Sequence, residues 1–560
     1  MDRDLESIQQ ARLLVEQAYK AHTQLSQFSQ DQVDSLVAHM AEAALGAAEK
    51  LARMAVEETG FGNYEDKILK NKFGAQFVHE AIKDLKTVGI IHEDPEKGIL
   101  EIASPVGVIA AIIPSTNPTS TTINKALIAL KGRNAIVFSP HPSASLCIQE
   151  TSKILSEAAL EAGAPEGVVG CLSVTTLEGN QELMRNRRTA LILATGGHGL
   201  VRAAYSVGKP AFGVGPGNVP AYVESSANIP QAINDIFTGK CFDNGTLCSS
   251  EQALITDASI KNHVVEEVKR QGGYFLNNDE IEVLGRAVVS EKQTVNPKIV
   301  GKPASTIASL AGISIPEKTR VLVTPLTGVG RDHPLSIEKL SPILAFYVEK
   351  DWQAACDRCI ELINYGGLGH TLAIHSRNDN IIRQFGLHKP VSRIVVNTQA
   401  ALGAVGYTTQ LFPSMTLGCG TLGGNITSDN ISPLHLINIK RVAYGQGDAS
   451  KPKQRPTPQQ LTSSNVSRYE IAALVDRLLS IRDFQPPPQV SAPSQPEPQA
   501  TQSSAEIADD KSPHPASFVC EEDIRQALKQ DKKIYVNTKS IITPAARDLG
   551  NEKEALVYLP

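Results

Sequence analysis

The sequence predicts an α/β protein built on parallel sheets. Short apolar runs alternate with helical stretches from residue 99 onward, which is typical of parallel strands joined by helices. The run at 106–113 is apolar or glycine throughout, as expected for a strand buried on both faces. The chain has 560 residues, of which 41% are hydrophobic and 20% charged. That length allows about two to four domains with sizeable cores, and sheets of this kind bind ligands at the carboxyl ends of their strands.

The expected elements follow in order along the chain. Residues 1–90 are expected to be helical, because apolar residues such as Ile8, Ala11 and Val15 recur at helical spacing. The first sheet is expected to contain strands at 106–113, 135–138, 168–172 and 190–194, with helices at 123–130 and 148–162 between them. The second helix should end at Gly163, where a helix stop is expected. A second α/β series should run from about 230 to 420.

The composition changes at about residue 446. Residues 446–466 and 483–516 are rich in Pro, Gln and Ser and are expected to be linkers, because such segments cannot bury enough apolar surface to fold. Between them, 467–482 carries one apolar stripe at helical spacing, which predicts an amphipathic helix. The last segment, 517–560, should contain a helix at 524–528 and a strand at 533–537.

Composition excludes several classes of function. The net charge of −5 offers no basic field for nucleic acid. Eight scattered cysteines are too few for a disulfide framework and suit a reducing compartment. Cys356 and Cys359 form one CxxC pair without a second pair, so we expect no metal site. The acidic N-terminus does not resemble a signal peptide, and no apolar run is long enough for a membrane span.

Cys248 is the strongest candidate for chemistry. It lies among small, flexible residues, three positions after the pair Asn244 and Gly245. A cysteine presented in this way can act as a nucleophile if its thiolate forms. The alternative is a buried structural cysteine, which is the commoner state of a free thiol.

Several short stretches carry a resemblance to a known family. They read IPSTNPTS at 113–120, FSPHP at 138–142, TGG at 195–197, GVGPGNVP at 213–220, FDNGTLCS at 242–249, EKLSP at 338–342, LGCGT at 417–421, GGN at 423–425 and LINIKR at 436–441. In this order, residues 100–445 resemble the CoA-acylating branch of the aldehyde dehydrogenase superfamily. They are similar to the enzymes of bacterial microcompartments that convert acetaldehyde or propanal into acyl-CoA.

The resemblance implies roles for the site residues. Cys248 would attack the aldehyde carbon, and the oxyanion that develops would be bound by the Asn117 amide and the Cys248 backbone N–H. Hydride would pass to NAD, leaving a thioester on Cys248. The residues expected to bind the cofactor are Ser139, Pro140, His141, Thr195, Gly196, Gly197, Gly215 and Glu338. His141 stands where hydrolytic members usually have lysine, which leaves NADP open.

Two of these residues also have a simpler interpretation. Asn117 precedes Pro118 and could be an ordinary turn residue, and Glu338 could be a solvated carboxylate. His370 lies between glycines at 366–371, so it could approach the site and assist proton transfer, or be a turn histidine.

The stretch 213–216 indicates how the thioester is released. Hydrolytic relatives carry a glutamate there that activates water, whereas this chain has no carboxylate in the stretch. Without that general base, water is a poor nucleophile, so coenzyme A should accept the acyl group.

The resemblance also implies an organisation and a location. We expect a Rossmann-type NAD-binding domain at 1–228, a catalytic domain at 229–420, a return or oligomerisation segment at 421–445, and a largely disordered extension beyond it. The helix at 467–482 resembles encapsulation peptides that bind microcompartment shell proteins, although it could fold back on its own protein. Residues 517–560 resemble the opening segment of ethanolamine-utilisation accessory proteins and are either a second docking element or a cap on the enzyme.

A cytoplasmic enzyme inside a microcompartment, assembled as a dimer or tetramer, is therefore expected. Two alternatives remain. One is a hydrolytic aldehyde dehydrogenase that yields a free acid, and the other is a catalytically inactive cargo or scaffold protein. The sequence leaves acetaldehyde, propanal and lactaldehyde open as substrates.

Overall fold

The computed structural model describes residues 2–290 and 294–445, together with short stretches between 516 and 558. The chain divides into two compact units, Met1–Ala449 and Ser450–Pro560, and each is described by itself. The predicted elements at 446–466 and 467–482, and the predicted linker at 483–516 except for Ala516, lie outside the described residues. In the part of the chain that is described, no helix combines the length and the apolar character that a membrane crossing requires.

The N-terminal region is helical, as predicted. Its helices are α1 (Arg3–Leu25), α2 (Gln30–Gly46), α3 (Ala48–Thr59), α4 (Tyr64–Lys72), the π-helical turn Phe73–Phe77 and α5 (Val78–Ile82). Ser29 and Gln32 form a reciprocal capping box at the start of α2, which satisfies two backbone donors. Helix α4 contributes buried lysines to the site described below.

The first sheet has five parallel strands. Their order is β5 (Val169–Cys171), β4 (Ala135–Ser139), β3 (Val108–Ile112), β6 (Thr189–Thr195) and β7 (Ala211–Val214). The helices of this region are α6 (Pro118–Lys131), α7 (Ser145–Glu161), α8 (Leu177–Arg185) and α9 (His198–Tyr205). Alternate residues of β3 enter two different cores, Ile109 with α6 and α7, and Val108 with α1. Both faces of the sheet are therefore covered, and the α/β prediction is confirmed.

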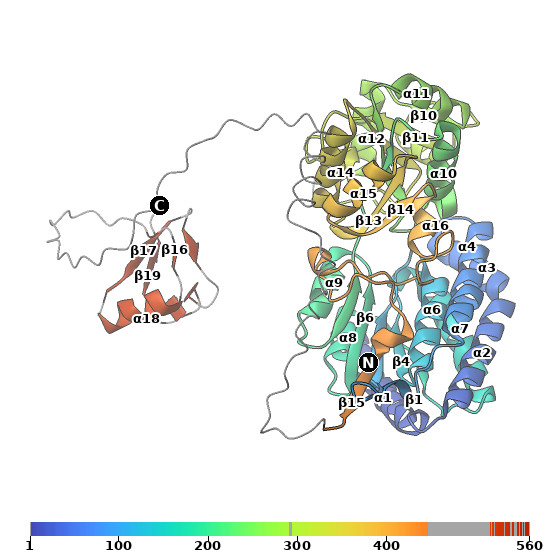
Figure 1. Ribbon diagram of the computed structural model, residues 1–560, viewed down its shortest axis with the longest axis vertical. Coiled ribbons are helices and arrows are strands. Elements are labelled where there is room, and N and C mark those ends of the chain that lie inside the picture. The colour runs from blue at the N-terminus through green and yellow to red at the C-terminus, as the bar shows by residue number, and fades with distance from the viewer. Residues whose placement is uncertain are drawn as a thin grey trace, which may run out of the picture. The chain divides into compact units, whose positions relative to one another are not determined.

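The second sheet has seven parallel strands. Their order is β10 (Gly273–Phe275), β11 (Val321–Pro325), β12 (Ile343–Glu349), β9 (Glu251–Asp257), β8 (Val219–Val223), β13 (Gly369–His375) and β14 (Val391–Val396). Its helices are α10 (Ile229–Cys241), α11 (Lys261–Arg270), α12 (Asn278–Val288), α13 (Ala304–Leu310), α14 (Trp352–Gly366), α15 (Asp379–His388) and α16 (Ala400–Ala404). Figure 1 shows this sheet and its helices, mostly in green and yellow, above the five-stranded sheet, which is drawn in cyan to teal-green.

Strand β8 lies inside the range 1–228 that was expected to form the first domain. It pairs with β9 and β13 of the seven-stranded sheet, so the chain passes from one sheet to the other between Val214 and Val219. Alternate side chains of β8 again enter two cores, Ala221 with α10 and Tyr222 with α14 and α15.

The chain returns to the first region near residue 440. Strand β15 (Ile437–Ala443), from the predicted return segment, pairs antiparallel with β2 (Ile99–Pro105), which also pairs with β1 (Gly89–Asp94). The side chain of Asn134 secures this return, because its Nδ2 donates to the Leu436 carbonyl oxygen at 2.8 Å and its Oδ1 accepts from Val106 N at 2.9 Å.

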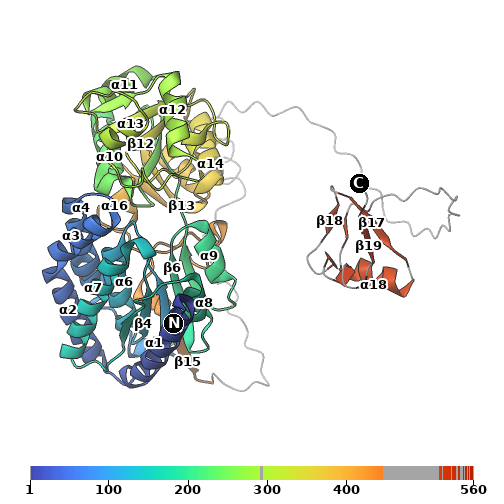
Figure 2. The ribbon, with the colours of Figure 1, turned by 180° about the vertical axis from the view of Figure 1, so that it is seen from behind.

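The second unit contains α18 (Glu521–Lys529) and short parallel strand pairs. Strand β16 (Phe518–Val519) pairs with β18 (Ile541–Ile542), and β17 (Ile534–Val536) pairs with β19 (Leu556–Tyr558). Helix α18 lies beside β17 and β19 (Figure 2), and its buried Ile524 packs with Val519 and Val536. The helix and strand predicted for this segment are confirmed.

Candidate active site

A cavity of about 430 Å³ lies at the carboxyl ends of the first sheet's strands. Residues that follow β3, β4, β6 and β7 line it, and the loops that carry Cys248 and Glu338 close it from the other region. The chain goes from β3 to β4 on one side of the sheet and reaches β6 on the other, so the cavity lies where the strand order reverses. Such switch points are the usual ligand sites of open α/β sheets.

Most of the predicted site residues meet at this cavity. Those that line it are Asn117, Pro140, His141, Thr195, Gly196, Gly197, Gly215, Cys248 and Glu338. Ser139 does not line the cavity; it is fully buried, and its hydroxyl contacts Asn180, which does line it. His370 also lies outside the lining, but it contacts Cys248.

Cys248 lies in the loop between a short 3₁₀ turn (Phe242–Gly245) and β9. Asp243, Asn244 and Gly245 all have positive φ (46°, 52° and 77°), which is costly for the two residues that carry a Cβ. Asn244 is held there because its Nδ2 donates to the Gly301 carbonyl oxygen at 2.9 Å. The neighbouring packing thus fixes the loop that presents the thiol.

His370 is the second residue of β13 and is fully buried. Its Nε2 lies 3.2 Å from Cys248 Sγ, and its Nδ1 lies 3.0 Å from Thr371 Oγ1. The preceding Gly369 has φ 73°, and a Cβ there would lie 1.7 Å from the Cys419 carbonyl oxygen, so glycine is required. The histidine is therefore a strand residue directed at the thiol, rather than part of a turn.

The Cys248–His370 pair is neutral at rest. Burial, reinforced by the charge of Glu338, raises the pKa of Cys248 to about 12. Burial, reinforced by the charge of Arg393, lowers the pKa of His370 to about 3. Both shifts oppose transfer of the proton from Cys248 to His370 in the resting site, because each charged form would lie away from water. The proton therefore moves only when attack on a substrate stabilises the products.

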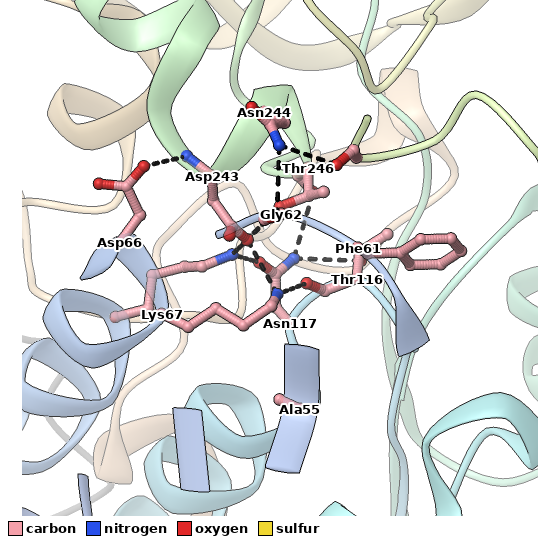
Figure 3. A network of polar contacts seen from close by, with 12 residues as sticks. Ala55, Phe61, Gly62, Asp66, Lys67, Thr116, Asn117, Asp243, Asn244 and Thr246 are labelled. Carbon is pink, nitrogen blue, oxygen red and sulfur yellow. Dashed lines mark hydrogen bonds and ion pairs between the residues drawn. The ribbon is translucent and has the colours of Figure 1, made fainter. Parts of the chain in front are cut away.

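Asn117 occupies the N-cap position of the buried helix α6, and its side chain faces the Cys248 loop instead of capping the helix. Its Nδ2 lies 3.1 Å from Thr116 Oγ1 and 3.4 Å from the Thr246 carbonyl oxygen (Figure 3). The amide nitrogen thus points toward the loop two residues before the thiol. A donor in this place can stabilise negative charge on an atom bound near Cys248.

At the end of the cavity away from His370, Thr195, Gly197 and Glu338 are the residues that could hold a nucleotide cofactor. The Thr195 hydroxyl is buried and has no hydrogen-bond partner within the described residues. A Cβ on Gly197 would meet no atom within 4 Å, so the backbone there borders open space. Glu338 Oε1 accepts from Gly217 N at 3.0 Å, and burial raises the pKa of Glu338 to about 7. These polar groups could fix the orientation of a bound ligand.

Sequence reasoning missed a buried charge cluster beside the site. Lys67 and Lys70 on α4 both contact the carboxylate of Asp243, and all three side chains are at most 3% exposed. Figure 3 shows Lys67 directed at Asp243. On the sequence, the two lysines fall in a polar helix and look like surface residues. Lysine is rarely fully buried unless it is paired, and the partner is more than 170 residues away, so no local signal revealed the cluster.

The predicted absence of a metal site concerns Cys356 and Cys359. Both lie buried on α14, where Lys389 Nζ contacts Cys356 Sγ. Over residues 2–290, 294–445 and the described part of the C-terminal unit, no group of three or more His, Cys, Asp and Glu residues is arranged to hold a metal ion.

Comparison with known sequences identifies relatives of the chain. The model of the Aldehyde dehydrogenase family matches residues 5–405. The bifunctional aldehyde-alcohol dehydrogenase AdhE of Escherichia coli K12 is 43% identical over 442 residues, which are 78% of this chain and 50% of that protein. The chain thus spans about half the length of this relative. The acetylating succinate-semialdehyde dehydrogenase of Clostridium kluyveri is 38% identical over 439 residues, 78% of this chain and 96% of that protein.

Solved structures agree with this relationship. An acetylating aldehyde dehydrogenase from Geobacillus thermoglucosidasius is 53% identical, with a TM-score of 0.79 over 80% of this chain and 100% of that one. A propionaldehyde dehydrogenase from the fucose-utilisation microcompartment of Clostridium phytofermentans is 31% identical, with a TM-score of 0.70 over 78% and 97% of the two chains.

A third structure contains the cosubstrate expected from the sequence. It is a Rhodopseudomonas palustris propionaldehyde dehydrogenase with bound CoA and an acylated cysteine, which is 29% identical, with a TM-score of 0.71 over 78% and 97% of the two chains. The family resemblance read from the sequence is confirmed, and the chain belongs to the aldehyde dehydrogenase family.

Proposed function

We propose that this chain oxidises a short-chain aldehyde with NAD and coenzyme A, forming acyl-CoA and NADH through a thioester on Cys248. The observation that carries the proposal is the 3.2 Å contact between Cys248 Sγ and His370 Nε2, beside a cavity that Asn117 also lines. A nucleophile, a base and an oxyanion donor are then within reach of one substrate carbon.

In the first step, the Cys248 sulfur bonds to the aldehyde carbon while its proton passes to His370. The carbonyl oxygen becomes an oxyanion, and donors directed at it from Asn117 and the Cys248 backbone N–H lower the barrier by about 3–4 kcal/mol each. Because the site is buried, these donors are worth more than they would be in water.

The cofactor would be held by residues after β4 and β6 together with Glu338. Pro140 and His141 would border its adenosine ribose, Thr195 to Gly197 its nicotinamide end, and Glu338 the nicotinamide ribose. When bound, NAD supplies the hydride acceptor for the oxidation. His141 leaves a cofactor with a 2′-phosphate as the alternative, and a comparison of NAD with NADP decides between the two.

Release of the acyl group by coenzyme A is favoured over release by water. Among the described residues that line the cavity, Glu338 is the only carboxylate, and it accepts a hydrogen bond from Gly217 N. A thiol ionises more readily than water and needs less help from a base. The acylated, CoA-bound R. palustris structure supports the same chemistry here.

An assay of cofactor and cosubstrate requirements tests the proposal. NADH formation is followed at 340 nm with aldehydes of two to four carbons, with and without CoA, and the product is identified by mass spectrometry. We expect turnover that requires CoA and yields acyl-CoA. Equal turnover without CoA, with a free acid as the product, would establish the hydrolytic alternative, and no turnover with any of these aldehydes would favour the inactive scaffold.

A location inside a microcompartment is the second part of the proposal. The C. phytofermentans enzyme comes from such a compartment, and residues 467–482 resemble an encapsulation peptide. Deletion of 467–482 should abolish co-localisation with co-expressed shell proteins and leave the activity of the free enzyme unchanged. Unchanged packaging would refute the role of this segment.

A homo-oligomer, dimer or tetramer, is also proposed. Strand β15 is at an edge of its three-stranded sheet and exposes Ile439 and Val442, with Tyr444 directly after it. An exposed edge strand with apolar side chains is suited to pairing with another chain. Light scattering coupled to size exclusion measures the assembly, and a monomer at micromolar concentration would contradict this proposal.

A further inference from the structure

We propose that Lys70 is a positioning residue that fixes the orientation of the Asn117 side-chain amide, so that its nitrogen faces the reacting oxyanion. This inference rests on the proposed function, because it assigns the oxyanion to Asn117. It concerns a helix, α4, that sequence reasoning had not connected with the chemistry.

The contact itself determines which end of the amide faces Lys70. Lys70 Nζ lies 2.6 Å from Asn117 Oδ1, and both side chains are buried. An ammonium group has three donors and no acceptor, so only the amide oxygen can face it. The NH₂ group must then point away from Lys70, toward the loop of Thr246 and Cys248, where its Nδ2 is found 3.4 Å from the Thr246 carbonyl oxygen.

Three acceptors saturate the Lys70 ammonium. Besides Asn117 Oδ1, it contacts the Asp243 carboxylate and lies 3.2 Å from Thr246 Oγ1. Asp243 is itself fixed, because its Oδ1 accepts from Asn63 N at 2.9 Å. The lysine therefore has little freedom to release the amide, and its position is coupled to the loop that also carries Cys248.

Without Lys70, the amide could rotate by 180° and present its oxygen to the developing negative charge. The oxyanion would then lose a donor and face an acceptor. Loss of one such donor lowers kcat by about 10²–10³-fold. Because the amide would still populate the productive orientation part of the time, we expect a loss of about 10–100-fold on removal of Lys70.

Lys67 provides a matched control. It lies one helical turn away on α4, is equally buried and contacts the same carboxylate, at 3.0 Å. Its other acceptor is the Thr116 carbonyl oxygen at 3.3 Å, whereas the hydrogen bonds of the Asn117 amide go to Lys70, Thr116 and Thr246. Lys67→Met, like Lys70→Met, thus removes one of the two positive charges paired with Asp243, but it leaves the amide oriented.

The test is a double-mutant cycle on steady-state kinetics of the full chain. We expect Lys70→Met to lower kcat about 10–100-fold with KM for the aldehyde nearly unchanged, and Lys67→Met to stay within about threefold of wild type. Lys70→Gln keeps a donor without the charge and should recover part of the loss. In an Asn117→Ala background, Lys70→Met should cause no further loss, because the residue through which it acts is gone.

Two results would overturn the assignment. One is a fall in kcat for Lys67→Met as large as that for Lys70→Met. The other is a double variant, Lys70→Met with Asn117→Ala, whose loss of kcat equals the product of the two single losses. If Lys70→Met does not fold, as judged by thermal melting and NAD binding, the same cycle with Lys70→Gln decides. The acylation step is shared by CoA-dependent and hydrolytic reactions. The role of Lys70 can therefore be refuted while CoA dependence holds, and CoA dependence can be refuted while the role of Lys70 holds.

Discussion

The Nε2 atom of His370 lies 3.2 Å from the Sγ atom of Cys248, although 122 residues separate the two in sequence. Strand β13 carries the histidine, and the loop before β9 carries the cysteine. Because β13 and β9 both flank β8 in one parallel sheet, their neighbouring ends bring the two side chains together. The sheet, and not a local motif, creates the pair.

His370 should make stability fall at acidic pH. Burial lowers its folded pKa to about 3, whereas an unfolded histidine titrates near 6.5. Below pH 6.5 the unfolded chain therefore binds a proton that the folded chain does not, so this contribution to stability is complete above pH 6.5 and is lost progressively toward pH 3. At pH 5 the loss is about 2 kcal/mol. His370→Asn should melt with a shallower decline between pH 7 and pH 5 than wild type; parallel declines would contradict the prediction.

Cys248→Ala should remove turnover without unfolding the protein. In the proposed reaction the thiol forms the covalent intermediate, so kcat should fall by about 10⁴-fold or more, while NAD affinity and melting temperature stay close to wild type. Cys241, which ends α10 seven residues earlier, has no assigned role, and Cys241→Ala should remain active. Retained NADH formation in Cys248→Ala would refute the assignment of the nucleophile.

The sequence predicted the parts of the site whose residue types are locally distinctive. Cys248, Asn117 and Thr195 stand in short stretches of small residues and proline after strands or loops, and the structure places all three at the cavity. The α/β architecture followed from apolar runs such as 106–113 in the same way.

What the sequence did not reveal depends on contacts between distant segments. Lys70 looks like an ordinary polar residue of α4, and only the folded chain shows that Asp243 neutralises it. Strand β8 follows β7 after a short connection, so nothing local indicates that it joins the other sheet. Pairing across long stretches of chain is set by the packing of the whole sheet, which periodicity cannot report.

Asp243→Asn should destabilise the enzyme more than Lys67→Met. The substitution leaves two buried ammonium groups without a counter-charge, which costs about 3–5 kcal/mol, whereas Lys67→Met leaves a one-to-one pair. Burial lowers the pKa of Lys70 to about 8, and Asp243 opposes that shift, so its removal should lower the pKa further.

The same substitution has a pH signature. The pKa of Lys70 in the folded chain lies below its unfolded value of about 10.5, so the unfolded chain binds more protons. The stability of the folded chain therefore rises with pH. The loss of stability of Asp243→Asn relative to wild type should therefore be smaller at pH 9 than at pH 7, as measured by thermal melting. An equal deficit at both values, or a deficit no larger than that of Lys67→Met, would contradict this account.

Gly217→Ala should move Cys248 away from His370 while leaving the charge of the site unchanged. A Cβ on Gly217 would lie 2.2 Å from the Cys248 carbonyl oxygen and 3.1 Å from the His370 ring, and the contact with a backbone atom can be relieved only by moving the loop. A displacement of about 1 Å can lower activity by about 10²-fold. The control is Gly199→Ala on α9, where a Cβ meets nothing within 4 Å and activity should stay within about twofold of wild type. Equal kcat/KM in the two variants would show that the Cys248 loop tolerates the displacement.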